Sequence, residues 1–228
     1  MKKGLTGNQL KLIAVIAMTV DHVGMVLFPS QLIFRIIGRL AFPIFAYMIA
    51  EGYAHTKNRL RYFLQISGLA AVCQLVYYVA LGSLYQSILV TFSLSILCMF
   101  AIDNFQRHKG FFSGALAMVV FGVVTYACRV LPRKLVGTDF GIDYGFLGVM
   151  LPVVVFLVPD KIGKLCAAGV ILVAMCSSYL NDIQWYALLA LPLLLLYNEK
   201  RGKAKLKYLF YIFYPTHLVA IHLIDMLI

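Results

Sequence analysis

Long apolar runs, separated by Pro, Gly and short clusters of charge, occupy almost the whole chain. Runs of about 20 such residues predict transmembrane helices, because a helix of that length spans the hydrocarbon core of a bilayer. The pattern predicts helices at residues 8–28, 32–53, 62–81, 87–103, 111–129, 144–158, 162–180, 183–197 and 207–228. The sequence therefore predicts an all-α, polytopic transmembrane bundle of about nine helices.

The composition is that of a membrane protein. Of the 228 residues, 62% are hydrophobic and only 13% are charged, whereas an ordinary globular domain is roughly 45–50% apolar. No internal repeat, low-complexity segment or long linker divides the sequence. We therefore expect a single multi-pass domain over residues 1–228, embedded in the cell membrane and surrounded by lipid.

The basic residues predict how the helices are oriented. The formal net charge is +11, but the cations lie between apolar runs, as they do in the cytoplasmic loops of membrane proteins. This distribution argues against a nucleic-acid partner. Strongly basic loops alternate with loops of little positive charge, where the only cations are Arg129, Arg133 and Lys134. We therefore expect the N-terminus in the cytoplasm and the C-terminus outside. The predicted inner cations are Lys2, Lys3, Lys57, Arg59, Arg61, Arg107, Lys109, Lys161, Lys164 and the cluster from Lys200 to Lys207.

Several classes of chemistry have no support in the sequence. The five cysteines lie in apolar runs, with no CxxC pair and no metal-ligand spacing, so we expect small buried side chains and no bound metal. The sequence also contains no GxSxG, HExxH, Walker or GxGxxG motif. A hydrolase elbow, a zinc protease, an NTPase and a Rossmann cofactor site are therefore not indicated.

Ionisable residues inside the predicted helices are the main functional candidates, because a charge at the bilayer centre costs roughly 2.5–3.5 kcal/mol. In the first predicted helix, Lys11 and His22 are eleven residues apart. This spacing puts them about 20° apart on one face and about 16 Å apart along the axis. Lys11 could instead extend to the cytoplasmic headgroups. For His22, a hydrogen-bonded structural histidine is the alternative to a functional one.

Arg39, in the second predicted helix, should reach a depth similar to that of His22. Arg35 lies one helical turn away, and two cations on one face repel each other unless a carboxylate or another anion lies between them. Asp21 could pair with them in a purely structural role. The other hypothesis is that Arg39 stabilises a developing negative charge beside a general base.

Two further regions bring polar groups into the membrane or to its predicted outer side, with His217 expected near mid-membrane. In the last predicted helix, Tyr214 and His217 belong to an aromatic stripe, a pattern that packing alone often produces. Before the helix at residues 144–158, Asp143 and Tyr144 stand among glycines that permit tight turns. These residues could line an acceptor site or only mark the entry into the membrane.

Four patches of the sequence fit a known family pattern. They are LKLIAVIAMTVDHVG at residues 10–24, GRLAFPIFAYMIAEGYAHT at 38–56, the stretch from YNEKRG to FYPTHL at 197–218, and DYG at 143–145. Together these patches resemble the TraX membrane acetyltransferases, and the likeness spans nearly the full length. The first patch is also similar to the basic-x10-His signature of acyltransferase-3 enzymes, with Lys11 where that group usually has Arg.

The resemblance implies an enzyme that uses acetyl-CoA from the cytoplasm and an acceptor near the outer face. The acceptor is an amine or hydroxyl of a peptide such as pilin, of a glycan or of a lipid. In this hypothesis His22 removes the acceptor proton, Arg39 stabilises the thioester oxyanion and Asp21 orients the imidazole. An acyl-histidine intermediate is equally open.

The other candidates are binding residues. Cations attract the phosphate groups of CoA. The residues expected to contact acetyl-CoA are therefore Lys11, Arg35, Lys57, Arg59 and Arg61. The acceptor contacts are Asp143, Tyr144, Tyr214 and His217. A carrier that binds a small anion or relays protons through the same charged residues is the alternative function. A noncatalytic scaffold for an envelope complex is a third.

Overall fold

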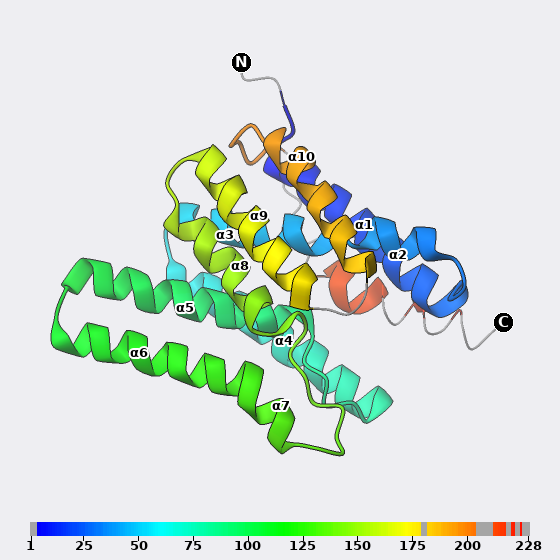
Figure 1. Ribbon diagram of the computed structural model, residues 1–228, viewed down its shortest axis with the longest axis horizontal. Coiled ribbons are helices and arrows are strands. Elements are labelled where there is room, and N and C mark those ends of the chain that lie inside the picture. The colour runs from blue at the N-terminus through cyan, green and yellow to red at the C-terminus, as the bar shows by residue number, and fades with distance from the viewer. Residues whose placement is uncertain (1–3, 179–181, 204–211, 218–219, 222–223, 225–228) are drawn as a thin grey trace. The chain divides into compact units, whose positions relative to one another are not determined.

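The computed structural model describes residues 4–178, 182–203, 212–217, 220–221 and 224 (Figure 1). Every regular element within those residues is a helix, which confirms the predicted all-α class. The chain forms two compact units, one of Met1–Met48 with Asp160–Ile228 and one of Ile49–Pro159. The single functional domain over residues 1–228 stays a prediction.

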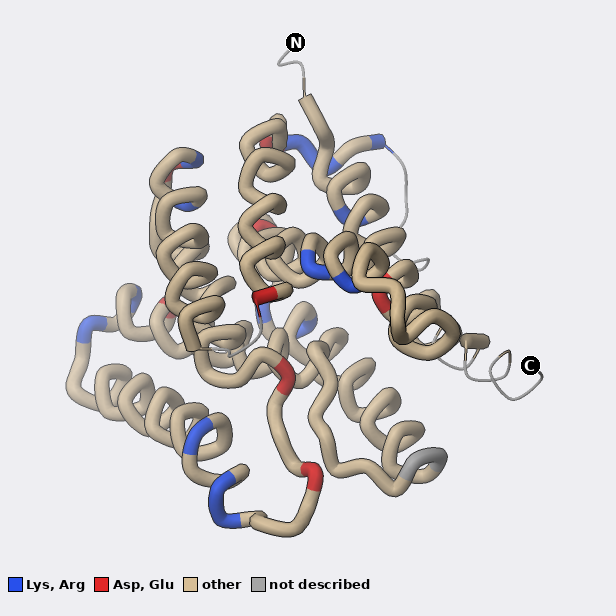
Figure 2. The backbone as a smooth tube through the Cα atoms, turned by 45° about the vertical axis from the view of Figure 1, so that its right-hand side comes forward, with Lys and Arg blue, Asp and Glu red and all other residues tan. Residues whose placement is uncertain are grey.

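Helices long and apolar enough to cross a bilayer define a membrane protein. Within the described residues they are Gly7–Leu27, Leu32–His55, Arg59–Val79, Ile88–His108, Phe111–Lys134 and Lys161–Ser178. Large apolar side chains cover their outer faces: Met118 is 70% exposed and Val79 77%. A water-soluble surface rarely presents such faces, and Figure 2 shows most Lys and Arg residues at helix ends and in loops.

Most helix boundaries lie close to the predicted ones, but four predicted helices differ. The helix predicted at 87–103 extends to His108, and the one predicted at 111–129 continues through a π-helical turn to Lys134. The other two are interrupted. The predicted helix at 32–53 is broken into α2 (Leu32–Gly38) and α3 (Ala41–His55). The predicted helix at 183–197 is a 3₁₀ segment, Asp182–Leu189, followed by α10 (Ala190–Leu195). Most of the predicted helix at 207–228 lies outside the described residues, so the count of nine stays a prediction.

The first unit contains α1 (Gly7–Leu27), α2, the first part of α3, α9 (Lys161–Ser178), the 3₁₀ segment and α10. A capping box starts α1: Thr6 accepts from the backbone N–H of Gln9, and the Gln9 side chain accepts from the backbone N–H of Thr6. This exchange satisfies backbone donors that a helix start leaves without partners. Ala17, Met18 and Ala41 form a buried cluster next to Phe213 and Tyr214.

Two glycines let α1 and α2 approach closely. A side chain at Gly24 would clash with Phe34, and one at Gly38 would clash with the carboxyl group of Asp21. Small residues are the usual means by which helices in membranes come into backbone contact. Gly38 therefore makes room for the Asp21 side chain against the surface of α2.

The second unit contains α4 (Arg59–Leu81), α5 (Ile88–His108), α6 (Phe111–Thr125), a π-helical turn (Tyr126–Val130), α7 (Leu131–Lys134) and α8 (Gly145–Leu157). Asn58 caps α4 by accepting from the backbone N–H of Arg61. Gly82 ends that helix in the left-handed conformation, with φ +62°, which glycine adopts without steric cost. Ser95 on α5 donates to the carbonyl of Val149 on α8, at 2.8 Å.

We expect Gly38→Ala to destabilise the protein by about 1–3 kcal/mol, the usual cost of forcing an extra carbon into a packed contact. The reason is the clash with Asp21, so the thermal midpoint of the purified protein in detergent should fall. Gly68→Ala is the matched control, because nothing lies within 4 Å of an added Cβ there. A helical alanine at that position should leave stability unchanged or raise it by up to about 1 kcal/mol. Equal effects of the two substitutions would contradict this account of Gly38.

Candidate functional site

A contact between two histidines joins the ends of the chain within the first unit. Nε2 of His217, in the helical stretch 212–217, lies 3.1 Å from Nδ1 of His22 on α1. Nδ1 of His217 lies 2.9 Å from the carbonyl oxygen of Phe213. The His217 ring is buried and stacks on Phe213, with 5.0 Å between ring centroids. The position of His217 is therefore fixed on two sides.

These contacts determine where the protons lie when both rings are neutral. A carbonyl oxygen only accepts, so Nδ1 of His217 carries the hydrogen and Nε2 of the same ring is an acceptor. Nδ1 of His22 must then donate to it. The assignment follows from the hydrogen-bond partners, and it leaves Nε2 of His22 with an unprotonated lone pair. That nitrogen has the electronic state of a general base.

A carboxylate holds two guanidinium groups beside the histidines. Asp21 accepts from Nη1 of Arg35 at 3.0 Å and from Nη2 of Arg39 at 3.0 and 3.1 Å. Nε of Arg39 donates to the carbonyl of Arg35, at 3.3 Å. The structure thus contains the Asp21–arginine pairing, whereas the contact described for the His22 imidazole is with His217. The orienting role of Asp21 toward His22 stays a hypothesis.

The break between α2 and α3 explains how Arg39 reaches its partners. Arg39 is the residue after the last one of α2, and its backbone N–H still bonds to carbonyls of that helix. From this position its Nη1 donates to Oε1 of Gln184, at 3.2 Å. Asp21, Arg35 and Arg39 together carry two positive charges and one negative charge. This net positive charge favours an anion or a developing negative charge nearby.

Gln184 is a site residue that the sequence did not single out. It lies in the 3₁₀ segment Asp182–Leu189, is 7% exposed, and its Nε2 atom has no hydrogen-bond partner among the described residues. A glutamine beside Asn181 and Asp182, between two apolar runs, has the composition of an ordinary loop. Only its contact with Arg39 distinguishes it, and the two residues are 145 positions apart.

Lys11, which is predicted to contact acetyl-CoA, lies on α1 near the end where Lys200 and Arg201 of the basic cluster are found. The carbonyl oxygens of Lys200 and Arg201 accept from the backbone N–H groups of Gly7 and Asn8, at 2.8 and 2.9 Å. The charge of Arg201 acts on Lys11. Positive charge therefore gathers at this end of α1, eleven residues before His22.

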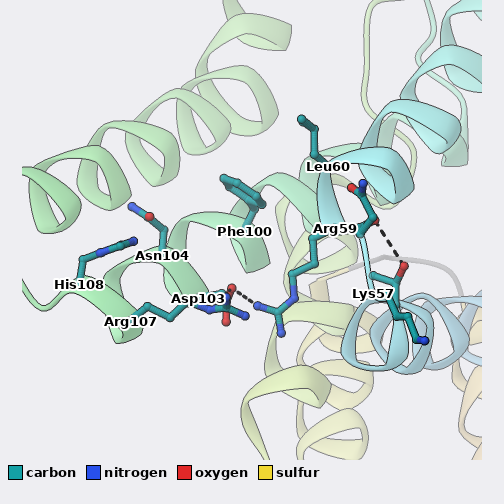
Figure 3. Close-up of a pocket in the computed structure, with 10 residues that line it drawn as sticks. Lys57, Arg59, Leu60, Phe100, Asp103, Asn104, Arg107 and His108 are labelled. Atoms are coloured by element: carbon teal, nitrogen blue, oxygen red, sulfur yellow. Dashed lines mark hydrogen bonds and ion pairs between the residues drawn. The ribbon is translucent and has the colours of Figure 1, made fainter.

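The predicted phosphate contacts lie in the second unit. Lys57 and Arg59 line a pocket of about 370 Å³ at the start of α4 and the end of α5 (Figure 3). Arg59 is ion-paired with Asp103, which also binds Nε of Arg107 at 3.0 Å. Arg61 is not among the lining residues. Of the described lining groups, Lys57, Arg59, Arg107 and Asp103 leave the pocket with a net positive charge.

The remaining residues predicted to contact the acetyl acceptor belong to different units. Tyr214 packs edge-on against His217 in the first unit, with 5.6 Å between ring centroids. Asp143 accepts from the hydroxyl of Tyr85 at 2.9 Å, and Tyr144 precedes α8 with φ +56°, both in the second unit. In the same loop, hydrogen bonds from Ser83 and from the backbone N–H of Leu84 lower the pKa of Asp139 below its usual range.

The helices and the polar cluster define an all-helical membrane protein with a histidine pair and an arginine–carboxylate cluster inside its first unit. A comparison with protein families gives a match to the TraX protein model over residues 6–225, and the chain belongs to the TraX family. A probable fimbrial assembly protein FimC of Dichelobacter nodosus, serogroup H1, is 26% identical over 92% of this chain and 91% of its own length.

A second relative matches over a shorter region. An uncharacterized protein, RP591, of Rickettsia prowazekii (strain Madrid E) is 48% identical over 52 residues, which are 22% of this chain and 21% of that protein. The chain therefore spans only about a fifth of this relative's length. No solved structure matches the chain. Family membership and the fold thus rest on the family model and on the helices.

We expect Asp21→Asn to destabilise the first unit by up to about 3–5 kcal/mol, because two guanidiniums would lose their shared carboxylate in a largely buried place. Arg35→Gln is the matched comparison. It leaves Asp21 paired with Arg39, and the Arg35 side chain is 30% exposed, so its cost should stay below about 1 kcal/mol. Unfolding in detergent measures both variants. An equal or larger loss in Arg35→Gln would contradict the central place of Asp21.

Proposed function

We propose that this protein is a multi-pass membrane acyltransferase that moves an acetyl group from acetyl-CoA to an amine or hydroxyl acceptor. Membership of the TraX family supports the proposal, as does the likeness to a probable fimbrial assembly protein. A pilin-like peptide is therefore a proposed acceptor, beside a glycan or a lipid. The alternating basic loops support an N-terminus in the cytoplasm and an acceptor site near the outer face of the cell membrane.

The observation that carries the proposal is the lone pair left on Nε2 of His22 by the chain of hydrogen bonds through His217. This nitrogen takes the proton from the acceptor as the acceptor attacks the thioester carbonyl. The net positive charge around Arg39 stabilises the negative charge that develops on the carbonyl oxygen. His217 positions His22 by accepting from its Nδ1.

Donor recognition is proposed to use positive charge. Lys57 and Arg59 line a pocket with a net positive charge, and the phosphates of CoA are the anions that such groups bind well. In the first unit, Lys11 and the segment around Arg201 add charge at the inner end of α1. Each set is a separate candidate for contact with the donor.

A carrier for a small anion is the second candidate. The net positive charge of Asp21, Arg35 and Arg39 favours it, because an intramembrane cation cluster of this kind can bind an anion without catalysing any reaction. A carrier that binds an anion by charge alone has no need of a histidine with a fixed, unprotonated Nε2, so the histidine pair favours the enzyme over a carrier of that kind.

Purified protein incubated with labelled acetyl-CoA, with hydroxylamine as a small acceptor, should release CoA thiol and form the acetylated product. We expect His22→Ala to lower kcat by about 100-fold or more, the usual contribution of a general base. His55→Ala is the matched control, because its side chain is 70% exposed, and it should keep full activity. Wild-type protein that binds no acetyl-CoA, or His22→Ala with unchanged kcat, would contradict the proposal.

The donor pocket has its own test. Lys57→Ala should raise KM for acetyl-CoA by about tenfold, since a hydrogen bond to a charged group contributes roughly 1.5 kcal/mol or more, and should leave kcat unchanged. Lys134→Ala, which removes a cation outside the pocket, should leave KM unchanged. Equal shifts in both variants would show a general charge effect, and no shift in Lys57→Ala would exclude the pocket as a donor contact.

A further inference from the structure

We propose that the side-chain amide of Gln184 is the hydrogen-bond donor to the thioester carbonyl oxygen during acyl transfer. The inference rests on the proposed acyltransferase function and assigns a catalytic residue in its site. It starts from a buried polar atom that lacks a partner among the described residues, Nε2 of Gln184.

The orientation of this amide is fixed by Arg39. A guanidinium only donates hydrogen bonds, so the Gln184 atom 3.2 Å from Nη1 of Arg39 is the oxygen Oε1. The other terminal atom of the amide is therefore the nitrogen Nε2, which carries two N–H donors. Gln184 is only 7% exposed, and a buried donor without a partner costs about 1–3 kcal/mol. Such an unpaired donor is suited to an acceptor oxygen supplied by a ligand.

The other unpaired buried groups among the described residues do not share these features. They are the hydroxyl groups of Tyr53, Ser67 and Ser87, and all three lie in the second unit. A hydroxyl both donates and accepts, and it rotates to suit a neighbour. The unpaired group of the Gln184 amide is an N–H donor, whereas its oxygen already accepts from Arg39. It is thus matched to a ligand atom that only accepts, such as a carbonyl oxygen.

Arg39 acts on the substrate through Gln184. Its Nη2 is bound to Asp21 and its Nε to the carbonyl of Arg35, so the guanidinium is held in place on two sides. Its bond to Oε1 draws electron density from the amide and strengthens Nε2 as a donor, as hydrogen bonds in a chain polarise one another. Arg39 supplies the charge, and Gln184 supplies the N–H group.

The step balances as follows. The acceptor nitrogen or oxygen bonds to the acetyl carbonyl carbon while Nε2 of His22 takes its proton. The carbonyl electron pair moves to oxygen, which accepts a hydrogen bond from Nε2 of Gln184. When the carbonyl reforms, the carbon–sulfur bond breaks, and the CoA thiolate takes the proton from His22. Acetyl-CoA and the acceptor thus give the acetylated acceptor and CoA thiol.

The test is Gln184→Glu in the full-length protein, assayed with acetyl-CoA and hydroxylamine. Glutamate keeps an oxygen for Arg39 but places an acceptor where the donor was. We expect kcat to fall about 100-fold to 1000-fold, as for the loss of one oxyanion donor, with KM for acetyl-CoA little changed. Gln9→Glu is the matched control, because glutamate also serves in the capping box at the start of α1, and it should keep wild-type kcat.

A second readout separates catalysis from folding. Dithioacetyl-CoA has sulfur, a weak acceptor, in place of the carbonyl oxygen. The ratio of the rate with acetyl-CoA to the rate with this analogue should be larger for wild-type protein than for uncatalysed aminolysis. In Gln184→Glu this ratio should fall to that of the uncatalysed reaction. If the ratio for wild-type protein is no larger than the uncatalysed one, the proposal is overturned whether or not the variant folds.

The outcomes also separate this inference from the proposed function. If wild-type protein is active and His22→Ala is not, but folded Gln184→Glu keeps kcat within about threefold, the enzyme stands and the role of Gln184 is overturned. If wild-type protein releases no CoA thiol at all, the acyltransferase proposal itself fails. A low thermal midpoint with normal kcat in Gln184→Glu would show a structural role and would also overturn the inference.

Discussion

The first unit depends on one carboxylate that binds two guanidinium groups in an apolar environment. Asp21 on α1 holds both Arg35 and Arg39. Isolated charges inside a bilayer are expensive, so these groups are stable there only together, and their pairing fixes how α1 lies against α2. Gly38 is required for the same reason, because any side chain at that position would occupy the space of the Asp21 carboxyl group.

The groups proposed to act on the substrate are held in place by their hydrogen-bond partners. The carbonyl of Phe213 fixes the proton of His217, and His217 in turn fixes the proton of His22. Asp21 and the carbonyl of Arg35 hold Arg39, which orients the amide of Gln184. Preorganised groups of this kind do not have to reorient when charge develops, which is the main source of electrostatic catalysis.

Positive charge has different roles in the two units. In the first unit it is largely shielded from the surface and partly neutralised by Asp21. In the second unit, Lys57, Arg59 and Arg107 line a pocket between helix ends, with Asp103 as the counter-charge.

The sequence by itself determined most helix positions and the membrane class, and it singled out His22, Arg39 and His217 as candidate site residues. Apolar length and a charge within an apolar run are local properties, so they can be recognised without a fold. Only the tertiary structure decided the partners: Asp21 with the arginines, His22 with a ring 195 positions away, and Gln184 as a member of the site. Hydrogen bonds need atoms within about 3 Å, and packing sets such distances between helices that are remote in sequence.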